Sequence, residues 1–146
     1  MNRWIMVTVL SSSLIFAACQ STSLVTPQQT STALLQNQTW ILTSIGNSQV
    51  RTPAHSPAPS IQFDPATQQV SGHDGCNRFF GTYAVQVDKI SMSPLAGTKM
   101  FCAQSQTLAN EYHVALKKVA AYQAYGKTLR LLDRHGNPLL QFESAQ

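Results

Sequence analysis

Alternating apolar and polar residues recur in short runs along most of the chain after Thr39, and this period of two is typical of half-buried β-strands. Such runs cover residues 40–43, 61–64, 69–73, 85–92, 129–132 and 138–143. Turn-forming residues at 46–47, 64–67 and 133–137 separate them. Prolines at 53, 57 and 59 exclude a central strand over 51–60 and predict an extended surface loop there.

One segment has a helical period instead. Between Ser105 and Ala121, apolar residues recur at steps of three and four, which predicts an amphipathic helix. These residues are Leu108, Tyr112, Ala115, Leu116, Val119 and Ala120. A narrow apolar stripe is better suited to covering a sheet than to lying on a membrane. We therefore expect an α+β domain over residues 39–146, with a mainly antiparallel β-sheet or partly closed barrel and one packed amphipathic helix.

The N-terminus has the features of a lipoprotein signal peptide over residues 1–18. Arg3 precedes an apolar stretch that is too short to span a membrane, and Ala17 and Ala18 supply the small residues needed for cleavage. The segment 16–19 resembles the bacterial lipobox, which implies lipidation of Cys19. The alternative is an ordinary cleaved signal with a stray cysteine.

Residues 19–38 are rich in Gln, Ser and Thr and show no periodicity. We expect this segment to be the lipidated cysteine followed by a flexible tether, although Leu34 and Leu35 could begin a short helix leading into the domain. Gln20 stands where lipoproteins kept at the inner membrane often carry Asp. The resemblance therefore implies an outer-membrane lipoprotein that faces the periplasm, held to the membrane through its N-terminal lipid.

Composition narrows the classes of partner. Of the 146 residues, 43% are hydrophobic and 11% are charged, so a compact domain with a weakly charged surface is expected. Ten Lys and Arg residues exceed six Asp and Glu residues, but the basic residues are scattered and not interleaved with aromatic residues. This distribution argues against nucleic-acid binding.

The most distinctive segment covers residues 70–83 and contains three glycines within ten positions, which indicates special backbone geometry or close approaches. Its central residues are Gly75, Cys76, Asn77, Arg78 and Gly81. Together with Trp40-Ile41-Leu42, the Thr-x-Met-x-Cys motif at 98–102, Glu111 and the final hairpin, the segment resembles the META domain of HslJ-type heat-shock lipoproteins. The resemblance implies an envelope protein associated with stress tolerance, without an established enzymatic reaction or cofactor.

The cysteine count points to a disulfide. If Cys19 carries the lipid, Cys76 and Cys102 are left in an oxidising compartment and should pair. The alternative is two buried free thiols, because the sequence does not give their separation in space.

Two more specific hypotheses for the same segment, a metal site and a catalytic cysteine, have less support. His73 and Cys76 have a spacing that could hold a metal, but the other candidate ligands show no ligand spacing, so we expect no metal or cofactor. Those candidates are His55, Asp74, Cys102, His113 and His135. A cysteine nucleophile would need Cys76 with a base, His73 or His113, and Asp74 to orient it.

Structural roles suit these residues better. Asp74 precedes Gly75 and is expected to accept hydrogen bonds in a turn, whereas Arg78 could bind an anion or donate to loop carbonyls or Glu111. We expect the segment 72–81 to be an architectural loop, and we expect Phe79, Phe80 and the nearby Tyr83 to enter the core.

The sequence thus favours a non-enzymatic, lipid-anchored envelope protein linked to stress or drug tolerance, with an unidentified envelope partner. The alternative is an inhibitor or binding module for a cell-wall enzyme or another envelope partner, and the loop 51–60 would suit such a role.

Overall fold

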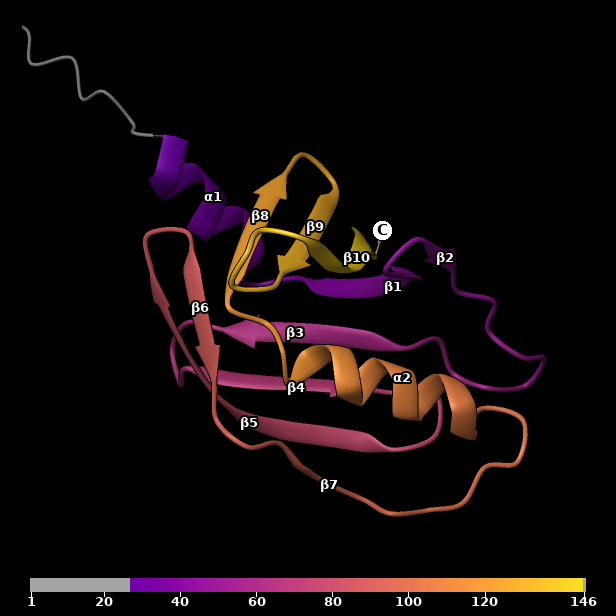
Figure 1. Cartoon of the computed structure of the whole chain (residues 1–146). Coiled ribbons are helices and arrows are strands. Elements are labelled where there is room, and N and C mark those ends of the chain that lie inside the picture. Colours follow the sequence, from indigo (N-terminus) through magenta and orange to yellow (C-terminus); the bar gives the residue numbers. More distant parts are fainter. Residues whose placement is uncertain (1–26, 146) are drawn as a thin grey trace, which may run out of the picture.

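The computed structural model describes residues 27–145, which form a β-barrel with two helices (Figure 1). The elements are α1 (Pro27–Leu35), β1 (Thr39–Ile45), β2 (Ser48–Gln49), β3 (Ser60–Asp64), β4 (Gln69–His73), β5 (Arg78–Gln86), β6 (Lys89–Met92), β7 (Ala96–Gly97), α2 (Gln106–Leu116), β8 (Ala121–Tyr125), β9 (Thr128–Leu132) and β10 (Pro138–Ser144).

Eight of the strands close on themselves. Their order is β10-β9-β8-β6-β5-β4-β3-β1, and β1 then pairs with β10, while β2 and β7 are short additions to β1 and β5. All of these pairings are antiparallel, and Leu42 lies opposite Phe142 at the closing seam. The expected α+β class with a mainly antiparallel sheet is confirmed. Closure removes the exposed edges that an open sheet would present.

Inward-facing residues of the strands fill the barrel. In β1 and β3 the buried positions alternate with more exposed ones, as the period of two predicts. The buried strand residues include Trp40, Leu42, Ile61, Phe63, Val70, Phe79, Tyr83, Leu129, Leu131, Leu140 and Phe142. Burying each of these side chains contributes about 1.5 to 3 kcal/mol, so the barrel interior is the main source of stability.

Helix α2 is shorter than the pattern predicted. It ends at Leu116, and the amides of Lys118 and Val119 donate to carbonyls three residues earlier, at Ala115 and Leu116. The chain then enters β8, where Tyr122 and Ala124 point into the core. The expectation of helix as far as Ala121 is wrong, because buried pairing with β9 overrides a short helical periodicity.

The segment 72–81 is less of a loop than expected. It contains the end of β4 and the start of β5, and only residues 74–77 connect them. Phe79 and Tyr83 are buried as expected, but Phe80 is 60% exposed. The prediction for Phe80 is wrong, because successive side chains of a strand point to opposite faces.

Structure also begins earlier than expected, since α1 occupies part of the predicted tether. Leu35 at its end is fully buried, and the Trp40 indole Nε1–H donates to the Leu35 carbonyl at 2.9 Å. Helix α1 contacts β8, where the Thr32 and Tyr122 hydroxyls lie 2.8 Å apart. Leu34 and Leu35 are therefore the last residues of a short helix, whereas the sequence suggested that they could begin one.

The expected signal peptide, residues 1–18, and Cys19 lie outside the described residues. Among residues 27–145, no helix has both the length and the apolar character needed to cross a membrane.

The burial of Leu35 makes α1 part of the folded unit. We predict that Leu35→Ala lowers the free energy of unfolding by about 2 to 5 kcal/mol, the usual cost of such a truncation in a core. Chemical denaturation would measure this loss. Val114→Ala is the matched control, since Val114 is 52% exposed on α2. Equal midpoints for the two variants would show that α1 does not belong to the core.

Candidate functional site

The turn between β4 and β5 is built around the Asp74 side chain. Its Oδ1 atom accepts the backbone amides of Cys76 at 2.8 Å and Asn77 at 2.5 Å, and the Asp74 amide donates to the Asn77 carbonyl at 2.9 Å. Gly75 has φ +95°, a region that side chains disfavour. The expectation that Asp74 accepts hydrogen bonds in a turn is confirmed, and these contacts explain the Asp-Gly-Cys-Asn order.

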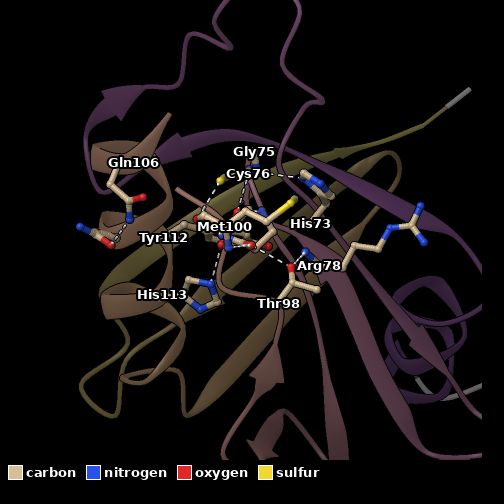
Figure 2. Close-up of polar contacts among 12 residues, drawn as sticks. His73, Gly75, Cys76, Arg78, Thr98, Met100, Gln106, Tyr112 and His113 are labelled. Carbon is tan, nitrogen blue, oxygen red and sulfur yellow. Dashed lines mark hydrogen bonds and ion pairs between the residues drawn. The ribbon is translucent and has the colours of Figure 1, made fainter. Parts of the chain in front are cut away.

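Asn77 connects this turn to the segment that follows β7. Its Oδ1 atom accepts the Met100 amide at 2.7 Å and the Thr98 hydroxyl at 2.8 Å, and its Nδ2 atom donates to the Met100 carbonyl at 3.1 Å (Figure 2). The side chain thereby takes the place of a paired strand along residues 98–100. An apolar residue at position 77 would leave these backbone groups without those partners.

A disulfide joins the same two segments. Cys76 and Cys102 are bonded, with their Cα atoms 5.7 Å apart, so the pairing expected from the cysteine count is present. The bridge closes a loop with a sequence separation of 26. Such a loop is stabilised by roughly 3 to 4 kcal/mol through the reduced entropy of the unfolded chain.

The second oxygen of Asp74 binds helix α2. His113 Nε2 lies 2.8 Å from Asp74 Oδ2, and the side chains are 34% and 3% exposed, respectively. An ionised carboxylate can only accept, so Nε2 carries the proton and donates. The His113 ring also packs edge-on to Phe79, with centroids 5.5 Å apart. Both residues are candidates in the sequence, but no sequence pattern indicates that Asp74 and His113 lie side by side.

Tyr112 supports this contact from the core side of α2. Its hydroxyl donates to the Ser60 carbonyl at 3.2 Å, and its ring packs near Phe79 and Phe142. Burial raises the pKa of the Tyr112 phenol well above its ordinary value, and the negative charge of Asp74 adds to this effect. The phenol therefore remains a neutral donor.

The two remaining residues of the motif, Gly81 and Arg78, lie outside the hydrogen-bonded turn. At Gly81, a Cβ atom would lie 2.8 Å from both Leu95 Cδ2 and Ser93 Oγ, so the glycine lets Leu95 rest on β5. Arg78 is exposed, and its side chain extends away from Thr98 and Met100 (Figure 2). Within residues 27–145 its guanidinium makes no hydrogen bond, and the expected bond to loop carbonyls or Glu111 is not formed.

The side chains that could act in catalysis or metal binding around the β4–β5 turn are already bonded to other groups of the protein. The Cys76 thiol is consumed in the disulfide, so it is not the nucleophile of the alternative reading. His73 Nδ1 accepts the Gly75 amide at 3.0 Å and is thus part of the turn. In the described part of the chain, the His113 side chain hydrogen-bonds to Asp74 alone, and no three potential metal ligands come together.

Two adjoining cavities lie between α2 and residues 92–101. The first, here called the turn cavity, has a volume of about 430 Å³ and is lined in part by Asn77, Phe79, Thr98, Lys99, Asn110 and His113. The second, the helix-end cavity, has a volume of about 560 Å³ and is lined in part by Met92, Leu95, Leu116, Lys117 and Val119. Leu95 and His113 line both cavities, which are together called the α2 groove here.

The described residues form a small antiparallel barrel of eight strands that is cross-linked by the Cys76–Cys102 disulfide. The α2 groove lies beside its packed helix. The family model of the META domain matches residues 33–146. The chain therefore belongs to the META domain family, as its motifs implied, and the match begins within α1.

Solved structures share the fold. An NMR structure of a protein from Burkholderia xenovorans is 24% identical with a TM-score of 0.63, and the match covers 79% of this chain and 86% of that one. A second NMR structure is 26% identical with a TM-score of 0.59, covering 76% and 92%. A crystal structure of a duf4847 family protein from Bacteroides vulgatus is 19% identical with a TM-score of 0.55, covering 76% and 94%. No curated protein matches the chain.

The disulfide can be tested by counting thiols. We predict that alkylation of the denatured but unreduced protein labels neither Cys76 nor Cys102, and that labelling after reduction adds two groups to the mass of the segment they span. Intact-mass and peptide-mass analysis would measure both states. Labelling of both residues before reduction would show that the bridge is not formed in the protein as isolated.

Proposed function

We propose that the protein is a non-enzymatic, lipid-anchored envelope protein that supports stress or drug tolerance by binding an envelope component. The lipobox-like sequence at residues 16–19 supports the anchor. The stress-tolerance role is taken from the resemblance to HslJ-type lipoproteins, and the match to the META domain supports that resemblance at the level of the family.

One observation favours binding over catalysis. The polar groups of the 74–77 turn are used to hold backbone, and its cysteine is bonded to Cys102. A catalytic site needs an ionisable pair placed beside a reactive group in a concave site. The pair Asp74 and His113 is present, but a nucleophile bonded to it is absent from residues 27–145. What adjoins the pair is the α2 groove, which suits recognition.

The second candidate is an inhibitor or binding module for a cell-wall enzyme. The connection between β2 and β3 favours it, because half of its residues are exposed and could reach a partner, as an inhibitory loop requires. Arg51 and His55 are among these exposed residues. Deletion of residues 52–57 would remove binding to such an enzyme while leaving the α2 groove in place.

The anchor and the tolerance role can be tested together. We predict that Cys19→Ser moves the protein from the membrane fraction to the soluble fraction, because an acyl-modified cysteine is what holds it at the bilayer. Fractionation and immunoblotting would measure this shift, and growth of a complemented deletion strain under envelope stress would measure tolerance. A Ser12→Ala variant is a control within the leader. A Cys19→Ser protein that still sediments with membranes would contradict the anchor, and full tolerance in the deletion strain itself would contradict the role.

A further inference from the structure

The free edge of β7 faces no other strand within the described part of the chain. Strand β7 pairs with β5 alone, through Ala96 opposite Phe80 and Gly97 opposite Phe79. The Thr98 amide donates to the Arg78 carbonyl at 3.1 Å. Because bonded and non-bonded pairs alternate in an antiparallel ladder, Gly97 directs its N–H and C=O away from β5.

The α2 groove runs along the segment that contains this edge. The turn cavity is lined by residues 95–101 and the helix-end cavity by residues 92–95, each with residues of α2 on the other side. Apolar side chains of Phe79, Leu95 and Leu116 contribute to the walls. An extended peptide that paired with the edge could therefore place alternate side chains into two hollows.

Within residues 27–145, three cationic side chains that make no ion pair line the groove: Arg78, Lys99 and Lys117. Arg78 and Lys99 line the turn cavity, and Lys117 lines the helix-end cavity. The single carboxylate that lines the two cavities is that of Asp74, which is buried and bonded to His113. The groove thus presents unpaired positive charge near both of its hollows, which complements an acidic ligand.

Exposed apolar side chains lie beside the turn cavity. Met100 is 59% exposed and Phe101 is 81% exposed, although both are large and apolar. The bonds between Asn77 and Met100 hold the backbone of this segment, so the two side chains are presented from a fixed position. Exposed large apolar residues on an ordered segment are typical of an interaction surface.

From these observations we propose that the α2 groove binds an extended acidic peptide segment of a partner protein, which adds a strand to the free edge of β7. The inference rests on the proposed function in one respect, that the protein acts by binding. It goes further in naming the site and the chemistry of the partner: a backbone to pair with Gly97, carboxylates for Lys99 and Lys117, and apolar side chains for the two hollows.

The test is titration of the full chain, purified in detergent, with an acetylated and amidated hexapeptide of alternating Glu and Leu. Two-dimensional NMR should show amide shifts confined to residues 92–101 and the facing side of α2, and slower exchange of the Gly97 amide. The double variant Lys99→Gln and Lys117→Gln should bind about tenfold more weakly, since each partly exposed charge pair contributes modestly. Lys118→Gln is the matched control, because Lys118 lines a different hollow, with Glu111 and Val114.

Each other outcome overturns the inference. Equal binding of a hexapeptide with Lys in place of Glu would exclude recognition of carboxylates by the lysines. Binding of decanoate at the groove without binding of the acidic peptide would identify an acyl-ligand site instead. Absence of any shift at residues 92–101 would exclude the site, while the fractionation and tolerance results for Cys19→Ser would still stand or fall separately.

Discussion

Asp74 is 2% exposed, and both of its carboxylate oxygens are used. A buried carboxylate is unfavourable unless hydrogen bonds replace its lost hydration. Here two backbone amides of the β4–β5 turn bind one oxygen and His113 of α2 binds the other, so satisfying one charge fixes a turn and a helix relative to each other. Cys76 and Asn77 supply those amides. Asp74 therefore fixes the backbone from which Cys76 forms the disulfide and from which the Asn77 side chain bonds to the Met100 backbone.

The residues that stabilise the domain are different from those that form its open strand edge. The barrel interior, the Tyr112 contacts and the disulfide hold the domain, whereas the segment after β7 is held by the Asn77 side chain and not by a full strand partner. This leaves one edge of the backbone open beside α2. The edge is short and lies beside a helix, so it is protected from the uncontrolled pairing that a long exposed strand would invite.

Much of the barrel could be predicted from local patterns, because the alternation around Trp40, Phe63 and Leu131 reflects burial on one face of each strand. Closure through β1 and β10 could not, because the pairing of residues about 100 positions apart leaves no periodic mark. The extent of helix α1, which begins at Pro27, could not be predicted for a related reason. The helix is anchored by Leu35, which is fully buried, and by a hydrogen bond from Trp40 to the Leu35 carbonyl. Neither contact produces a helical stripe in the sequence.

The site was predictable in its parts. Counting cysteines gave the pairing of Cys76 with Cys102, and the Asp-Gly order gave the turn. The contact of Asp74 with His113 joins residues 39 positions apart through the packing of α2, so residue types alone could name both without placing them together. The open edge of β7 depends on which strands fail to pair, and a sequence pattern carries no such information.

Asp74, acting through the β4–β5 turn, orders the segment after β7. Amide hydrogen exchange in the unmodified protein tests this ordering most directly, because the Met100 amide donates to Asn77 Oδ1 at 2.7 Å while the adjacent Lys99 amide has no acceptor among residues 27–145. We expect the amides of Cys76, Asn77 and Met100 to exchange as slowly as those of the barrel strands, and the Lys99 amide to exchange rapidly. Rapid exchange at Met100, equal to that at Lys99, would contradict it.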